Sequence, residues 1–156
     1  MTDEAARAVE VLDSMRGLEL LVAELYRGFA GAFPEDRALW EDLVREEEGH
    51  AAALAELKDT VGRCGGRVEQ AKSNPAALAT YRKGVEDQIG RLRKGGLFRT
   101  AALFIARDLE RTLIERKYFD IVACDDAEFR AVRDRIEGET RSHLGKLESY
   151  IGALGL

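Results

Sequence analysis

Residues 43–54 read LVREEEGHAAAL and include His50, one of only two histidines in the chain. Around them, apolar side chains recur every three or four residues, the spacing that places them on one face of an α-helix. Glu47 and His50 fall in the middle of this face, whereas Glu46 and Glu48 fall to its sides. The face comprises Trp40, Leu43, Glu47, His50, Leu54, Leu57 and Val61. The stretch therefore predicts a buried helix face that carries a carboxylate and an imidazole.

The second histidine, His143, lies on a comparable face near the end of the chain. That face comprises Phe129, Val132, Ile136, Thr140, His143, Leu147, Tyr150 and Leu154. Two further carboxylates, Glu19 and Glu110, interrupt apolar faces of their own, although Arg107 lies close to the second. The sequence thus places three carboxylates and both imidazoles on faces that we expect to point into the protein.

All segments of the chain follow helical spacing, and none shows the sustained alternation of a β-strand. Glycines separate the segments, and Pro34 and Asn74-Pro75 are typical of helix starts. The expected helices are 3–31, 34–61, 75–94, 97–124 and 127–154, the last one capped by Asp125-Asp126. Helices of this length favour one all-α domain over residues 1–156. We expect an antiparallel four-helix bundle, with helix 75–94 in the crossover between the second and third bundle helices.

The composition excludes several classes of function. The 156 residues are 46% hydrophobic and 34% charged, with a formal net charge of -5, which argues against binding to nucleic acid or anionic membranes. No apolar run approaches the ~20 residues of a membrane span, and the acidic N-terminus is unlike a secretory signal. Cys64 and Cys124 are far apart and form no CxxC motif. We therefore expect no disulfide framework, no thiolate metal site, and a reducing cytoplasm.

Buried carboxylates on these faces need a compensating partner, because an unpaired buried ion costs several kcal/mol. Carboxylates that meet at one level of the bundle would also repel one another. A divalent cation removes both costs, and carboxylate together with imidazole suits iron, manganese or zinc. Glu47 and His50 are three residues apart and can reach the same ion. We therefore predict that a metal is bound by Glu19, Glu47, His50, Glu110 and His143.

Each of these residues also has a reading without a metal. His50 alone fits a hydrogen-bonded core histidine, and Glu47 alone fits a salt bridge to an arginine from a neighbouring helix. A core ion-pair network with arginine partners would use the same side chains. The remaining glutamates of these helices fit solvated or ion-paired positions: Glu24, Glu46, Glu48 and Glu115.

The first and fourth expected helices share a pattern, LELLVAELYRGF at 18–29 and LERTLIERKYFDI at 109–121. In both, a Leu-Glu pair is followed five residues later by another glutamate. Glu19 therefore matches Glu110, at an offset of 91 residues (110 minus 19). The two histidines have a similar offset of 93 residues (143 minus 50). A duplicated helical hairpin leaves such a pattern.

With these residues in this order, the chain resembles the ferritin-like superfamily and, within it, the rubrerythrin-like proteins. Their site takes one Glu from each of two helices and a Glu-x-x-His from each of the other two. Here E47-E-G-H50 is a complete Glu-x-x-His, and Glu19 and Glu110 match the single glutamates. The resemblance covers most of the chain except the crossover. Two tyrosines also stand where such proteins often carry them, Tyr26 and Tyr118.

The second copy of the motif departs from this pattern. It reads E139-T140-R-S-H143, so Thr140 stands where the family's second bridging glutamate belongs. By resemblance, Glu47 would bridge two iron ions, each histidine would ligate one ion, and Glu19 and Glu110 would be terminal ligands. Glu139, Glu115 or water would then complete the weaker position. A single metal held mainly by Glu47 and His50 is the other arrangement.

The resemblance implies a non-haem di-iron, mixed-metal or single-metal carboxylate protein with oxidase or peroxidase activity on O₂ or hydrogen peroxide. We expect no rubredoxin-like domain of the kind that full rubrerythrins carry, so electrons would come from an external donor. The family also implies a homodimer. The alternative, which Thr140 favours, is a catalytically inactive metal-binding or helical interaction protein.

Overall fold

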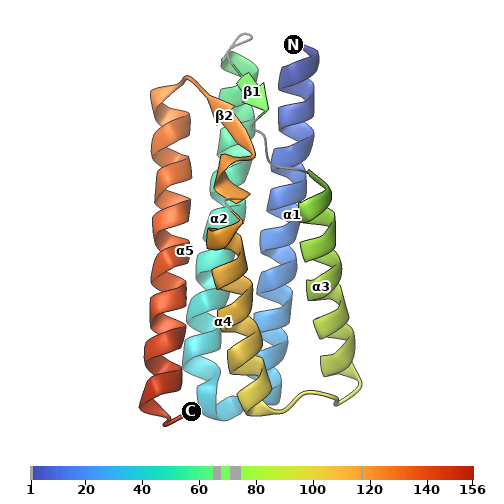
Figure 1. Ribbon diagram of the computed structural model, residues 1–156, viewed down its shortest axis with the longest axis vertical. Coiled ribbons are helices and arrows are strands. Elements are labelled where there is room, and N and C mark those ends of the chain that lie inside the picture. Colours follow the sequence, from blue (N-terminus) through green and yellow to red (C-terminus); the bar gives the residue numbers. More distant parts are fainter. Residues whose placement is uncertain (1, 65–67, 71–74, 117) are drawn as a thin grey trace.

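The computed structural model describes residues 2–64, 68–70, 75–116 and 118–156 (Figure 1). Almost all of this part is helical, which confirms the all-α prediction. The helices are α1 (Asp3–Ala32), α2 (Arg37–Arg63), α3 (Pro75–Arg93), α4 (Arg99–Glu115) and α5 (Ala127–Ala153). Short 3₁₀ helices at Pro34–Asp36 and Tyr118–Asp120 precede α2 and follow α4, and the two strands are β1 (Val68–Gln70) and β2 (Val122–Cys124). None of the described helices is long and apolar enough to cross a membrane.

The long helices lie side by side along the molecule (Figure 1). Helix α1 packs mainly on the antiparallel α2, α5 contacts both α4 and α2, and α3 packs against α1. Helix α3 lies between α2 and α4 in the chain and runs back along the molecule (Figure 1). The buried faces of all five helices form one hydrophobic core, which contains most of the predicted apolar positions. Leu154, predicted on the inner face of α5, is instead exposed after the helix ends.

The predicted helix over 97–124 is too long. Helix α4 ends at Glu115, and the chain continues through a 3₁₀ turn into β2, which pairs antiparallel with β1. The register places Val68 opposite Cys124 and Gln70 opposite Val122. No strand was predicted, because a pairing between segments this far apart leaves no periodic signal in either one. The expected N-cap Asn74 lies outside the described residues, whereas Asp126 does cap α5 by accepting the backbone N–H of Phe129 at 3.0 Å.

The prediction of two unpaired cysteines is wrong. Cys64 at the end of α2 and Cys124 in β2 form a disulfide. Both lie at the end of the bundle where the strands pair, and both are buried. The cytoplasmic location, which partly relied on free thiols, loses that support and stays a prediction.

An ion pair to a buried carboxylate fastens the opposite end of the bundle. Asp36, between α1 and α2, accepts two hydrogen bonds from Arg99 at the start of α4, both 2.7 Å long. The hydroxyl of Tyr150, near the end of α5, donates a third at 2.7 Å. The bonds from Arg99 lower the pKa of Asp36, although its burial opposes this, so the carboxylate stays ionised. This Asp36 clamp joins three segments at one level.

Candidate metal centre

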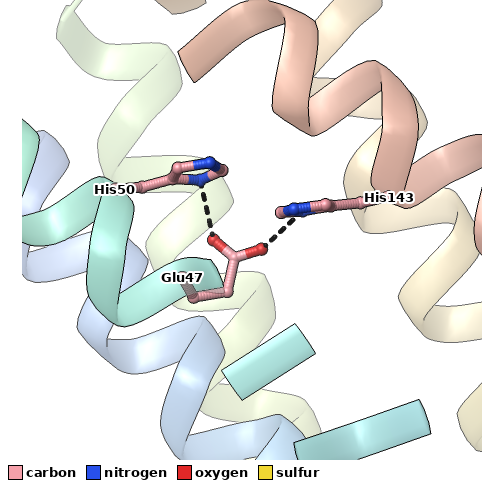
Figure 2. Close-up of side chains that lie close together, drawn as sticks. All are labelled: Glu47, His50 and His143. Atoms are coloured by element: carbon pink, nitrogen blue, oxygen red, sulfur yellow. Dashed lines mark ion pairs between the residues drawn. The ribbon is translucent and has the colours of Figure 1, made fainter. Parts of the chain in front are cut away.

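Glu47, His50 and His143 meet in the middle of the bundle, as Figure 2 shows. Glu47 and His50 lie one turn apart on α2, and His143 reaches them from α5. Nδ1 of His143 lies 3.1 Å from Oε1 of Glu47, and Nδ1 of His50 lies 3.5 Å from its Oε2. The side chains expose at most 2% of their surface. One carboxylate therefore lies between two imidazoles in a site closed to solvent.

The imidazole rings are nearly parallel, with centroids 5.1 Å apart and planes inclined by 15°. Each ring turns Nδ1 toward Glu47 and Nε2 toward a second glutamate on the opposite helix. Nε2 of His50 is hydrogen-bonded to Glu139 at 2.9 Å, and Nε2 of His143 lies 3.1 Å from Glu46. For His50, this hydrogen bond to an outer carboxylate places the proton on Nε2 and leaves the Nδ1 lone pair for a metal.

These outer glutamates occupy matching positions in the two motifs. Glu46 lies four residues before His50, and Glu139 lies four residues before His143. Both pairs are offset by 93 residues (139 minus 46, 143 minus 50), so Glu139 is the counterpart of Glu46 and not a displaced bridging glutamate. Thr140 is the counterpart of Glu47, and it is buried with its hydroxyl donating to the carbonyl of Ile136 at 2.9 Å.

Glu110 joins the cluster from α4. Its Oε2 lies 3.7 Å from Nδ1 of His143, and its Oε1 accepts a 2.6 Å hydrogen bond from the hydroxyl of Tyr26. Glu19 reaches the cluster from α1, where its carboxyl interacts with that of Glu47. Both glutamates are buried, as their apolar faces predicted.

Two residues that the sequence analysis singled out for the site lie outside the cluster. Glu115 is exposed at the end of α4, outside this cluster of contacts. Tyr118 turns its hydroxyl to the carbonyl of Ala77 at 3.1 Å and packs its ring against Tyr81, with centroids 5.5 Å apart. Of the two tyrosines that the resemblance singled out, Tyr26 alone hydrogen-bonds a cluster residue among the described contacts.

Burial and mutual repulsion set the protonation of the carboxyls. Burial raises the pKa of Glu19 well above its ordinary value, and the charges of Glu47 and Glu110 add to this effect. Burial and the charge of Glu47 raise the pKa of Glu110 to about 7. For Glu47, burial is outweighed by its close contacts with Glu19, His143 and His50, so its pKa is lowered. Glu47 is therefore the permanent anion of the site.

His143 carries the compensating proton. Burial alone would lower its pKa, but contacts with Glu110 and Glu47 outweigh that effect and raise the pKa to about 10. In the absence of a metal, protons thus perform the neutralisation that a cation would provide. Because metal ligands must give up these protons, metal binding at such a site depends on pH.

The cluster leaves an unusual number of buried polar atoms without hydrogen bonds. Buried side-chain atoms normally find a partner. Apart from the indole nitrogen of Trp40, every such atom among the described residues belongs to this cluster: Glu19 Oε2, Glu47 Oε1, His50 Nδ1, Glu110 Oε2, and both ring nitrogens of His143. Within the same described part, no arginine or lysine forms an ion pair with Glu19, Glu47 or Glu110, which argues against the alternative of a core network with arginine partners.

The set of donors fits a metal ion. Ligand atoms of Glu47, His50 and His143 all lie within 4.8 Å of one another, close enough to share one ion. Carboxylate oxygen and imidazole nitrogen suit iron, manganese and zinc. Comparisons of the chain with protein-family models, curated proteins and solved structures found no match. The geometry of these ligands is therefore the basis for the function proposed below.

Proposed function

We propose that this protein is a non-haem iron protein of the rubrerythrin-like type, with oxidase or peroxidase activity on O₂ or hydrogen peroxide. One observation carries the proposal: the inward nitrogens of two buried histidines face one ionised carboxylate, and these atoms lack hydrogen-bond partners. Glu47, His50 and His143 would form the main metal site, with Glu19 and Glu110 as additional ligands. Bound iron would supply the redox chemistry.

The chain's own residues would prepare the ligands. Glu46 and Glu139 orient the two imidazoles from outside, and the hydroxyl of Tyr26 holds one oxygen of Glu110. The closed helical core keeps bulk water away from the ligands. This strengthens each electrostatic contact because the local dielectric is low. The antiparallel arrangement with a helical crossover supports the ferritin-like reading of the fold.

Thr140 decides between two forms of the proposal. A pair of ions in such bundles is held by four carboxylates and two histidines. This cluster brings together three carboxylates, since the position that matches Glu47 holds Thr140. The second candidate function, a metal-binding or helical interaction protein without catalysis, is favoured by this missing carboxylate.

Metal content separates the candidates. Protein purified without chelator and then exposed to Fe(II), Mn(II) and Zn(II) in turn is analysed by plasma mass spectrometry. Roughly two iron ions per chain would support the di-iron form. Roughly one ion per chain would support the mononuclear form or the non-catalytic alternative, which an assay of oxygen and peroxide consumption then distinguishes. Absence of any bound metal would contradict the proposal.

The variant His50→Ala tests where the metal binds. Removing one of only two histidines is expected to abolish tight metal binding, because it takes away a ligand and unpairs Glu47. Glu48→Gln is the matched control, since Glu48 lies on the same helix but is exposed. Unchanged stoichiometry in His50→Ala would contradict the proposed site.

A further inference from the structure

The two histidines of the metal centre turn their outer nitrogens to the seam between α2 and α5, which run antiparallel (Figure 1). Polar side chains follow this seam at intervals of three or four residues on each helix: Asp42, Glu46 and His50 on α2, and Glu139, His143 and Lys146 on α5. Among the described residues, Glu46 and Glu139 are the only partly exposed carboxylates that contact the buried cluster. Charged groups in water therefore meet the buried ligands at this seam.

A cationic side chain already occupies the seam. Nζ of Lys146 lies 2.5 Å from Oδ2 of Asp42 and 3.2 Å from Oε2 of Glu46. The two carboxylates are four residues apart, so they project from one face of α2 on successive turns. All three side chains are 36% to 41% exposed. Because exposed ion pairs of this kind contribute little to stability, a divalent cation can displace the ammonium at little cost to the fold.

A buried ligand atom points at the same carboxylate. Nε2 of His143 lies 3.1 Å from Oε2 of Glu46, the oxygen that Lys146 also contacts, yet this buried nitrogen makes no hydrogen bond. Nδ1 of the same ring lies 3.1 Å from Oε1 of Glu47 inside the centre. The ring of His143 thus forms the boundary between the seam and the centre, and it contacts a carboxylate on each side.

The charges along the seam favour a cation. Three carboxylates, those of Asp42, Glu46 and Glu139, face the ammonium of Lys146. The guanidinium of Arg45 contacts the other oxygen of Asp42 at 3.2 Å, and its side chain is 69% exposed. Three negative groups against two positive ones leave an excess of negative charge, which raises the local concentration of cations. Carboxylate and imidazole are also the donors that suit iron, manganese and zinc.

We infer that Asp42, Glu46 and Nε2 of His143 form a capture site, at which a divalent metal cation replaces the ammonium of Lys146 before it passes to the centre. The inference rests on the proposed function only in that the centre binds metal, and it requires no catalysis. Lys146 swings aside on its flexible stem when the cation arrives, and it returns to the two carboxylates afterwards. Asp42 belongs to the capture site alone, since its contacts among the described residues are with Arg45 and Lys146.

Substitution of Asp42 tests the capture site separately from the centre. Metal-free protein is mixed rapidly with Co(II), and uptake is followed by the quenching of fluorescence from Trp40, the only tryptophan. We expect Asp42→Asn to take up Co(II) several-fold more slowly than the native chain, with the same affinity at equilibrium. Release must then slow by the same factor, because the route in is also the route out. Lower affinity with an unchanged rate of uptake would overturn the inference.

Asp13→Asn is the matched control. Asp13 also pairs with a lysine at 2.5 Å, Lys58, and its side chain is 48% exposed. Lys58 follows His50 by eight residues on α2, as many as separate Asp42 from His50 on the other side (58 minus 50, 50 minus 42). The substitution changes the net charge equally, but it should leave the rate of uptake at the native value. Equal rates in Asp13→Asn and Asp42→Asn would overturn the inference.

Removal of the competing ammonium should act in the opposite direction. We expect Lys146→Gln to take up Co(II) several-fold faster than the native chain, whereas the control Lys58→Gln keeps the native rate. Uptake by Lys146→Gln at the native rate or more slowly would overturn the inference. Normal uptake at one rate in all four variants would contradict the capture site alone. No uptake by the native chain would contradict the metal centre itself, and the capture site with it.

Discussion

At the scale of single residues, the site is defined by which nitrogen of each histidine faces inward. Glu139 and Glu46 take the Nε2 side of His50 and His143, so both Nδ1 atoms turn to Glu47. The outer glutamates are partly exposed, at 50% and 36% of their side chains. The orientation of the two buried imidazoles thus depends on carboxylates that solvent can reach.

Removal of one outer carboxylate should weaken metal binding without abolishing it. In Glu139→Gln, the partner of His50 Nε2 loses its charge, and we expect metal affinity to fall ~10–100-fold. Isothermal titration with Zn(II) measures the change. Glu137→Gln, two residues away on the same helix, is the control and should bind as tightly as the native chain. Equal affinity in the two variants would contradict an orienting role for Glu139.

The protonation of Glu110 and His143 predicts how stability depends on pH. The pKa of Glu110 rises from 4.5 to about 7, and that of His143 from 6.5 to about 10. Between these limits the folded protein binds more protons than the unfolded chain, so the metal-free protein loses stability as pH rises. Its free energy of unfolding should fall by on the order of 6 kcal/mol between pH 5 and pH 9.

Urea unfolding of metal-free protein at several pH values measures this trend. Glu47 acts in the opposite direction, but only below its ordinary pKa of 4.5, where stability is lost as pH falls. Added metal displaces protons, so the stabilisation that it gives should grow with pH. Metal-free stability that rises between pH 5 and pH 9 would contradict this account.

At the scale of the elements, the sequence predicted α1, α2, α3 and α5 to within a few residues of their observed bounds. Helical periodicity is a local signal, and the apolar faces of these helices repeat it over many turns. The same signal located Glu19, Glu47 and Glu110, because each interrupts an apolar face. It missed the contacts of Glu46 and Glu139 with the histidines, because a half-buried polar residue beside such a face looks like any solvated one. Their shared offset from the histidines was the available clue.

The end of α4 could not be predicted from local pattern. Residues 97–124 contain no proline and no glycine after Gly96 that would break a helix. The chain leaves the helix after Glu115 and enters a strand that pairs with β1, and a disulfide joins that strand to α2. Both partners come from segments distant in sequence. Two cysteines alone could not reveal this pairing.

Loss of the disulfide should lower stability but leave the metal centre intact. The bridge closes a loop over a sequence separation of 60, and a native crosslink of this kind contributes ~2–4 kcal/mol. We expect the double variant Cys64→Ala/Cys124→Ala to lose this much in chemical unfolding. Metal content should not change, because Cys64 lies ~20 Å along α2 from His50 at 1.5 Å per residue. If the double variant unfolds at the same denaturant concentration as the native chain, the disulfide has no stabilising role.

At the scale of the whole molecule, the contacts that join distant segments and the metal centre lie at three levels along the bundle. The Asp36 clamp lies at one end, the disulfide and the paired strands lie at the other, and the metal centre lies between them. The fold class, an all-α domain, could be predicted because every long segment shares one periodicity. The contacts that hold the two ends could not be predicted, because the Asp36 clamp and the disulfide each join side chains from segments far apart in the chain.

Helices of a bundle ordinarily fray from their ends inward, so amide hydrogens exchange most slowly in the middle. Here both ends are held, by the Asp36 clamp and by the Cys64–Cys124 bridge, while the middle carries the unpartnered polar atoms. Hydrogen–deuterium exchange of the metal-free protein should therefore run faster around His50 and His143 than beside either fastening. Metal should slow exchange in that central zone alone; slow central exchange before metal is added would mean that the empty centre is already rigid.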